Sequence, residues 1–139
     1  MDRYEFGNMM KKARKDSGMK TTDIIGSYGM MYNEIMKFEV GKSNFVLKRV
    51  VKYIDTIGYC ISFIKREDLI IDSEESIYKF IHTIVPDKEC TSIKLYYIFG
   101  VTQPSSWQIL NKQINLTIDP FLRFYDHFHL TPVIVKKKI

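Results

Sequence analysis

Residues 21–42 read TTDIIGSYGMMYNEIMKFEVGK, and they have the most informative local pattern in the sequence. It predicts two short helices, at 23–27 and 31–39, separated by a glycine that permits the positive φ of a tight turn. Thr21 and Thr22 are the candidate N-caps of the first helix, because their hydroxyl oxygens can accept from the free backbone N–H groups of its first turn. Two short helices joined by a glycine turn are typical of a helix-turn-helix unit.

The second of these helices has an apolar and a polar face. Ile35 and Phe38 recur at helical spacing and are predicted to point inward. The residues predicted to face solvent are Tyr32, Asn33, Glu34 and Lys37. In helix-turn-helix proteins the corresponding exposed helix enters the major groove of DNA.

Longer amphipathic helices are predicted on both sides of this unit. The first spans 4–17 and ends at Gly18. Its inward residues are Phe6, Met9, Met10 and Ala13, and its outward residues are Lys11, Lys12, Arg14 and Lys15. The other spans 45–57, with Leu47, Val50, Val51, Ile54 and Ile57 inward. Beyond Gly58 the pattern of 59–65 predicts a short strand.

Several motifs follow one another between Phe6 and Gly58. They are Lys12-Ala13-Arg14, Gly18, Thr21-Thr22-Asp23-Ile24, Gly29 and Phe38-Glu39-Val40-Gly41-Lys42. Together they resemble the Xre, or lambda-repressor-like, helix-turn-helix family, whose pattern is a basic first helix, two glycine breaks and a Glu-x-Gly motif. Ile25 departs from that pattern, because the family prefers a small residue where the two short helices meet.

The resemblance implies a role for individual side chains. Asn33 would read adenine, Lys37 would read guanine, and Tyr32 would touch a thymine methyl group or a phosphate. Thr21, Lys42 and Lys48 would contact phosphates, and Thr22 belongs to the same DNA-binding set. The alternative for each of these residues is an exposed, solvated side chain without a partner in DNA.

The apolar pattern of the first half recurs in the second half of the chain. An offset of 71 residues places the inward residues of the first helix on Ile77, Phe80, Ile81 and Ile84. The same offset continues without a gap as far as Phe63, which falls on Ile134. Two positions related by this offset, such as Phe6 and Ile77, are called counterparts below. Apolar counterparts coincide more often than a 45% apolar composition gives by chance. The sequence therefore predicts two consecutive copies of one fold.

The second copy is predicted to contain helices at 76–85, 92–98, 101–112 and 117–128, followed by a strand at 130–138. The resemblance makes Gln103 and Gln108 base readers and places Asn111 and Lys112 at the DNA backbone. Thr102 and Ser105 complete the DNA-binding set of this copy. Tyr96 and Ser106 argue against equal function in the two copies, since the family has a small residue and an apolar residue at these positions.

Basic charge is concentrated in the first copy. Residues 1–66 contain 13 Lys and Arg against 7 Asp and Glu, whereas residues 67–139 contain 8 against 9. A basic domain of this size indicates a nucleic-acid partner or an anionic membrane surface. The membrane alternative is the weaker one, because the basic helix lacks a large exposed apolar side.

The expected architecture is mainly helical, with two tandem lambda-repressor-like bundles that each end in a short strand. The predicted domains are 1–66, a helix-turn-helix DNA-binding domain, and 76–139, a second, divergent one, joined by a linker at 67–75. We expect the two strands to pair into a ribbon within an intramolecular pseudo-dimer, with Phe63 and Ile134 facing the helices. The alternative is a homodimer formed through the second copy.

The predicted function is sequence-specific binding of double-stranded DNA by a cytoplasmic prokaryotic or phage transcriptional regulator, a repressor. The alternative is a protein-interaction module, antitoxin-like, in which one or both copies dock a partner such as a toxin. No catalytic constellation, cofactor motif or membrane span is recognisable, so we expect no enzyme activity. His127 and His129 point to different sides of a helix end, so they do not predict a metal site. Cys60 and Cys90 form no disulfide framework, which indicates a reducing cytoplasm with two buried or idle thiols.

Overall fold

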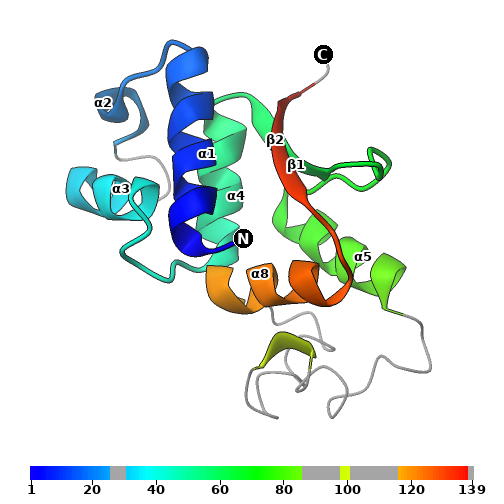
Figure 1. The fold of residues 1–139 in the computed structure, drawn as a ribbon. Helices are drawn as coiled ribbons and strands as arrows, with labels where there is room; N and C mark the ends of the chain where they lie inside the picture. The colour runs from blue at the N-terminus through cyan, green and yellow to red at the C-terminus, as the bar shows by residue number, and fades with distance from the viewer. Residues whose placement is uncertain (26–30, 86–97, 101–115, 138–139) are drawn as a thin grey trace.

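The computed structural model describes residues 1–25, 31–85, 98–100 and 116–137 (Figure 1). This part of the chain is mainly helical and contains one two-stranded antiparallel sheet, in agreement with the expected fold class. The elements in chain order are α1 (Arg3–Asp16), α2 (Thr21–Ile24), α3 (Tyr32–Glu39), α4 (Leu47–Thr56), β1 (Tyr59–Phe63), α5 (Glu74–Ile84), α8 (Ile118–His127) and β2 (Pro132–Lys136). The helices predicted at 92–98 and 101–112 lie mostly or wholly outside the described residues.

The two ends of α1 show why this segment is helical. The Asp2 carboxylate accepts from the backbone N–H of Glu5 at 2.8 Å and thereby caps the first turn. At the other end Gly18 adopts φ 78°, a left-handed conformation that costs glycine little. The helix predicted at 4–17 is therefore confirmed to within one residue at each end.

The predicted capping of α2 is wrong. The helix begins at Thr21 itself, so the N-cap is Lys20, and neither Thr21 nor Thr22 occupies the capping position. The acceptor in this turn comes from Asp23, whose carboxylate accepts from the backbone N–H of Lys20 at 2.7 Å. An aspartate three residues after the N-cap thus replaces the expected threonine hydroxyls.

The two predicted strands pair as expected. β1 and β2 run antiparallel, with Ser62 opposite Val133 in the register. Ile61 also pairs with Ile71 on the other side of β1, so the stretch predicted as a linker follows the strand closely there. The ribbon passes between α1 and α4 on one side and α5 on the other (Figure 1).

The core is continuous between the first and second halves of the chain. Phe63, at the end of β1, stacks on Phe80 of α5 with 5.0 Å between ring centroids, and it meets the ring of Tyr125 on α8 edge-on. Phe63 therefore packs on helices, as the sequence predicted, and Ile134 is partly buried against the same core. None of the helices in the described ranges has the length and apolar character needed to cross a membrane.

The helices at counterpart positions begin at matching residues, although α1 has 14 residues and α5 has 11. Helices α1 and α5 begin at the counterparts Arg3 and Glu74, and α4 and α8 begin at Leu47 and Ile118. The residues before α1 and α5 are the capping residues Asp2 and Ser73, which are also counterparts. After α4 and α8, Gly58 and His129 both adopt positive φ, at 81° and 55°.

Some counterparts also contact each other. Val46 forms an isolated antiparallel bridge with Thr117. The bridge consists of two reciprocal bonds, from Leu47 N–H to Leu116 O at 2.6 Å and from Ile118 N–H to Phe45 O at 2.9 Å. Leu47 and Ile118 are counterparts, and so are Phe45 and Leu116. The two bonds are therefore equivalent under the repeat.

Candidate nucleic-acid interface

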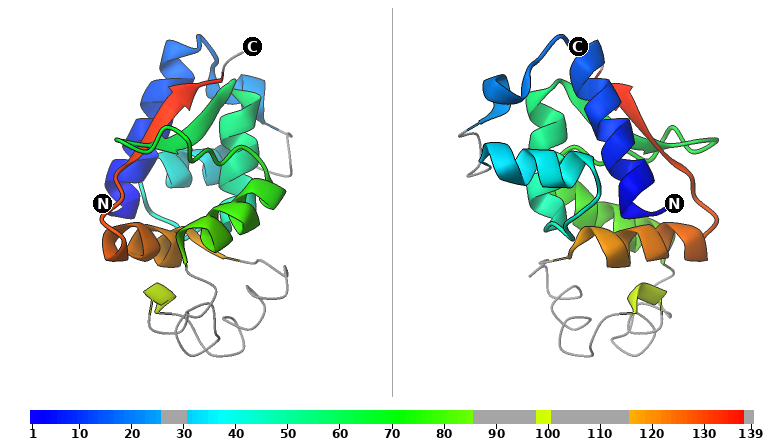
Figure 2. Two further views of the ribbon diagram at one scale, coloured as in Figure 1. Left: turned by 90° about the vertical axis from the view of Figure 1, so that its right-hand side faces the viewer. Right: turned by 60° about the vertical axis from the view of Figure 1, so that its left-hand side comes forward.

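Helix α3 lies on the outside of the molecule with one face open. Tyr32 is 49% exposed, and Asn33 and Lys37 are exposed as well. In the right-hand view of Figure 2, α3 lies in front of the other elements on this side. The three side chains predicted to contact bases are therefore accessible from solvent.

The opposite face of α3 is fully packed. Ile35 and Phe38 are buried in the core, and the ring of Phe38 meets Phe45 and Tyr53 edge-on, with centroids 5.5 and 5.3 Å apart. Edge-to-face rings at this separation attract each other in addition to the free energy gained by burying them. The inward assignment of Ile35 and Phe38 is confirmed, and it fixes which side of α3 faces outward.

A buried polar network holds the C-terminal end of α3. The Arg14 guanidinium of α1 donates to both carboxylate oxygens of Glu39, at 2.8 and 2.9 Å, and the Tyr53 hydroxyl of α4 donates to the same carboxylate at 2.7 Å. Arg14 also donates to the backbone carbonyl of Met19 at 3.1 Å, in the connection before α2. The network therefore ties α1, α3, α4 and the connection before α2 together.

The predicted outward position of Arg14 is wrong. Arg14 is buried, whereas Lys12 and Lys15 of the same helix are exposed. Helical spacing assigns a charged residue to the outside unless a buried partner is known, and the partner here lies on another helix, distant in the sequence. The Glu-x-Gly motif contains that partner, Glu39. The sequence therefore showed the acidic residue of the pair but not its contact with Arg14.

The network also shifts the pKa values of its members. The hydrogen bond to Glu39 raises the pKa of Arg14 above its ordinary value, against the opposing effect of burial. Desolvation, followed by the negative charge of Glu39, raises the pKa of Tyr53 well above its ordinary value. At neutral pH the network therefore contains a guanidinium cation and a neutral phenol that donates its proton.

Glu34 was predicted to face solvent, but it is half-buried and forms an ion pair. Its carboxylate accepts from the Arg49 guanidinium of α4 at 3.0 Å, and both side chains are about one-third exposed. This ion pair braces the N-terminal half of α3, as the Arg14–Glu39 pair braces its C-terminal end.

The other residues predicted to bind DNA surround α3 at different levels of exposure. Thr22 and Lys42 are exposed, and Thr21 and Lys48 are half-buried at the starts of α2 and α4. Helices α2 and α3 lie on the same side of the molecule (Figure 1). The predicted residues of the second copy lie outside the described residues, and they are Thr102, Gln103, Ser105, Gln108, Asn111 and Lys112.

Three exposed apolar residues next to this face were not predicted from the sequence. Met31 precedes α3, Met36 lies within it, and Val40 follows it, with 61%, 37% and 38% of their surfaces exposed. Met36 and Val40 follow Tyr32 at steps of four residues, so helical spacing alone could have placed them on the outer face.

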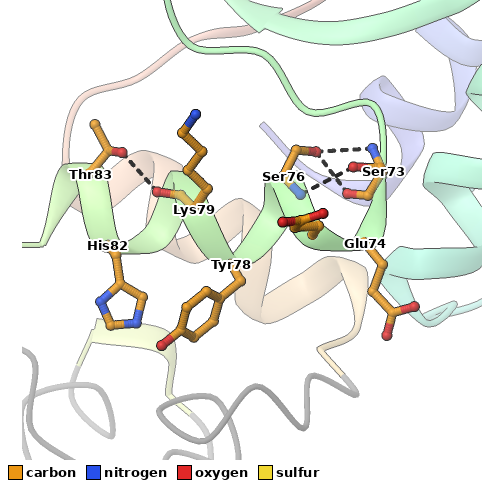
Figure 3. Close-up of a pocket in the computed structure, with 8 residues that line it drawn as sticks. Ser73, Glu74, Ser76, Tyr78, Lys79, His82 and Thr83 are labelled. Atoms are coloured by element: carbon orange, nitrogen blue, oxygen red, sulfur yellow. Dashed lines mark hydrogen bonds between the residues drawn. The ribbon is translucent and has the colours of Figure 1, made fainter.

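A hollow lies along α5, and the serine and threonine side chains that line it form hydrogen bonds within the helix and its N-cap (Figure 3). The Ser73 and Ser76 side chains exchange hydrogen bonds with each other's backbone N–H groups, at 2.9 and 3.2 Å. The Thr83 hydroxyl donates to the Lys79 carbonyl. These hydroxyl groups are therefore engaged in capping and stabilising α5, which explains their presence without a ligand.

The described residues contain no group of three His, Cys, Asp or Glu side chains close enough to hold a metal ion. Cys60 is buried in β1, and desolvation raises the pKa of its thiol, whereas Cys90 lies outside the described residues. A neutral buried thiol is a poor nucleophile, so Cys60 serves as a core residue.

No protein-family model, curated protein sequence or solved structure matches the chain.

Proposed function

We propose that this protein binds double-stranded DNA sequence-specifically, as a cytoplasmic prokaryotic or phage transcriptional regulator, by inserting α3 into the major groove. The observation that carries the proposal is the contrast between the two faces of α3. Its inner face is fixed by Ile35, Phe38 and the Arg14–Glu39 pair, whereas Tyr32, Asn33 and Lys37 are exposed together on the outer face. A rigid helix with an open polar face is what direct reading of bases in the major groove requires.

The charge distribution supports the same function. The excess of 13 basic over 7 acidic residues lies in residues 1–66, which include α3. Electrostatic attraction between basic side chains and DNA phosphates supplies most of the sequence-independent affinity for DNA. In this protein the excess of basic side chains lies in the same half of the chain as the exposed helix.

We further propose that the chain consists of two tandem helix-turn-helix copies arranged as an intramolecular pseudo-dimer. The matching first residues of α1 and α5, and the matching bounds of α4 and α8, support the repeat. The reciprocal bonds around Val46 and Thr117, and the pairing of Ser62 with Val133, support a local two-fold axis, because each pair joins counterpart positions of the repeat. In this arrangement the second copy would offer its own reading helix, with Gln103 and Gln108 toward a second half-site.

A second candidate function is docking of a protein partner on the same face. The exposed apolar surfaces of Met31, Met36 and Val40 favour it, since methionine-rich exposed surfaces are frequent at protein interfaces. Salt dependence separates the two functions. A duplex binder making about six phosphate contacts loses roughly three orders of magnitude in affinity between about 50 and 200 mM salt, and a docking module does not bind duplex.

The test is selection of duplexes from random DNA by the full-length chain, followed by titration of Lys37→Ala. We expect this variant to weaken specific binding by about 1–3 kcal/mol and to relax the preference at one base pair, because the lysine no longer donates to a base edge. Lys79→Ala is the matched control, because it removes the same charge from α5, on the opposite side of the molecule (Figure 1). Equal affinities of the two variants would remove Lys37 from the reading set.

A further inference from the structure

We propose that α3 reads thymine by apolar contact, with the Met36 side chain lying against the C5-methyl groups of thymines in the major groove. The inference rests on the proposed DNA-binding function and adds the chemical class of base pair that the site selects. It assigns a role in base recognition to a residue that the spacing of polar side chains did not reveal.

The position of Met36 on α3 is the first argument. Met36 follows Tyr32 by four residues and Asn33 by three, so it lies one helical turn farther along the same exposed face. Ile35 and Phe38 already fill the space between α3 and the core, and 37% of the Met36 surface remains open to solvent. A large apolar side chain in this place therefore has surface left to bury against a partner.

The chemistry of the whole face is the second argument. The five exposed residues from Tyr32 to Val40 comprise one cation, Lys37, one amide, Asn33, and three side chains that offer mainly apolar surface. The floor of the major groove presents hydrogen-bonding groups at all four bases, and its one apolar group is the thymine methyl. Apolar side chains placed over a G·C pair would cover polar base edges without satisfying them, which costs free energy.

The neighbouring amide fits the same base pair. Asn33 can form two hydrogen bonds with the N6 and N7 atoms of adenine, the base that pairs with thymine. Tyr32 and Met36, four residues apart, form a row beside the row of Asn33 and Lys37 on the exposed face. Their apolar surfaces can therefore contact thymine methyl groups at this pair or at the adjacent one. The face thus combines an adenine reader with thymine readers.

The depth of Met36 in the groove is set by the supports of α3. The Glu34–Arg49 and Arg14–Glu39 pairs hold the helix before and after Met36, at 3.0 and 2.8 Å. The backbone at Met36 is thereby fixed, whereas its unbranched side chain can adjust to the position of a methyl group.

The experiment uses the full-length chain and one duplex selected from random DNA. It is compared with a set of duplexes in which the thymines of the selected site are replaced one at a time by uracil, which pairs with adenine but lacks the C5-methyl group. We expect each uracil at a contacted position to weaken binding of the unmodified protein by about fourfold, the effect of one buried methyl group.

Two variants then assign the effect to Met36. Met36→Leu keeps an apolar side chain and should retain the preference for thymine over uracil. Met36→Gln has a similar length and helix propensity but a polar end, and it should bind the thymine and uracil duplexes about equally at that position. Far-UV circular dichroism of both variants checks that the exposed substitution leaves the helices intact.

The possible failures are distinguishable. If the protein binds the selected duplex with a steep salt dependence but does not discriminate uracil from thymine, the inference is overturned and the proposed function stands. If Met36→Gln discriminates as strongly as the unmodified protein, the methyl contact belongs to another residue and the assignment of Met36 is overturned. If no duplex is bound at low salt, the proposed function and this inference fall together.

Discussion

Two buried tyrosines, one in each half of the core, differ in whether their hydroxyl groups form a hydrogen bond. The Tyr53 hydroxyl donates to the Glu39 carboxylate, so its burial satisfies a hydrogen bond to a charged group. The Tyr125 hydroxyl is also buried, but it finds no partner among the described residues, and its ring packs against Phe63 and Phe121. An unsatisfied buried hydroxyl costs free energy that a phenylalanine at the same position would avoid.

Tyr→Phe substitutions at these two positions should therefore change stability in opposite directions. Tyr53→Phe should lower the free energy of unfolding by about 1.5–3 kcal/mol, because it leaves the Glu39 carboxylate with one donor fewer. Tyr125→Phe should leave the free energy of unfolding unchanged or raise it by up to about 1 kcal/mol. Urea unfolding at pH 7 measures both, and equal destabilisation by the two changes would contradict the difference in hydrogen bonding.

Alkaline pH should destabilise the protein through the same residues. Burial raises the pKa of Tyr53 and of Tyr125 in the folded state, whereas an unfolded tyrosine ionises near pH 10. The stability that comes from these raised pKa values is fully present below pH 10 and is lost as the pH rises further, because the unfolded state then releases protons that the folded state retains. The measurement is the free energy of unfolding in urea between about pH 8 and 11.

The alkaline loss should be smaller in the variants that lack a buried phenol. Tyr53→Phe and Tyr125→Phe should each flatten the decline, and Tyr4→Phe, at an exposed aromatic residue of α1, is the matched control. A decline of the same size in all three variants would show that other groups cause it.

The sequence predicted the exposure or burial of some single residues correctly and of others wrongly. The exposure of Tyr32, Asn33 and Lys37 followed from helical spacing, because that spacing decides which side chains share a face. The burial of Arg14 did not, because it depends on a carboxylate that only the tertiary fold brings within 2.8 Å. The exposure of Met36 was missed for the opposite reason, since an apolar residue is expected to be inside.

At the scale of elements, the orientation of α3 depends on how closely α1 approaches it. Gly7 of α1 is buried against the end of α3, and a Cβ atom at this position would lie 2.4 Å from the Phe38 carbonyl oxygen and 2.9 Å from that of Glu39. Both contacts are with backbone, which cannot rotate away. The glycine therefore permits the short distance that the Arg14–Glu39 pair requires.

Gly7→Ala should accordingly destabilise the protein and weaken the proposed binding to DNA. Alanine is favoured over glycine inside a helix by about 1 kcal/mol, so the change would be stabilising if α1 were isolated. In the folded protein we expect a net loss of about 1–3 kcal/mol from overpacking, together with displacement of α3. Urea unfolding and duplex titration measure the two effects. Asn8→Ala, at the exposed neighbouring position, is the control that should keep both values, and a stabilised Gly7→Ala would refute the close packing.

Element boundaries were predictable where local chemistry sets them. The predicted 4–17 and 31–39 helices agree with α1 and α3 to within one residue, and Asp2, Gly18 and Gly41 mark three of their four ends. α4 begins at Leu47 rather than at 45, since the Phe45 carbonyl and the Leu47 N–H instead bond to Ile118 and Leu116. α2 also differs, because a four-residue helix carries too little periodic pattern to be located from the sequence.

At the scale of the whole molecule, contacts between the halves are numerous and of several kinds. The β1–β2 ribbon, the bridge between Val46 and Thr117 and the ion pairs Arg3–Asp119 and Asp55–Lys137 each join a residue of the first half to one of the second. Local sequence patterns predicted the strands but did not determine their register, which is set by packing around Phe63. A molecule joined in this way should unfold as one cooperative unit, although its sequence reads as two domains.

Phe63→Ala tests this cooperativity. Phe63 belongs to the first half, and its ring stacks on Phe80 and meets Tyr125 in the second, so its truncation should lower the free energy of unfolding by about 3–5 kcal/mol. Native-state hydrogen exchange should report the same loss in α4 as in α8, because both helices then open only through global unfolding. Ile64→Ala, at the adjacent exposed residue, is the control and should change little. A loss confined to α8, with α4 still protected, would mean that the halves fold independently and that the ribbon only tethers them.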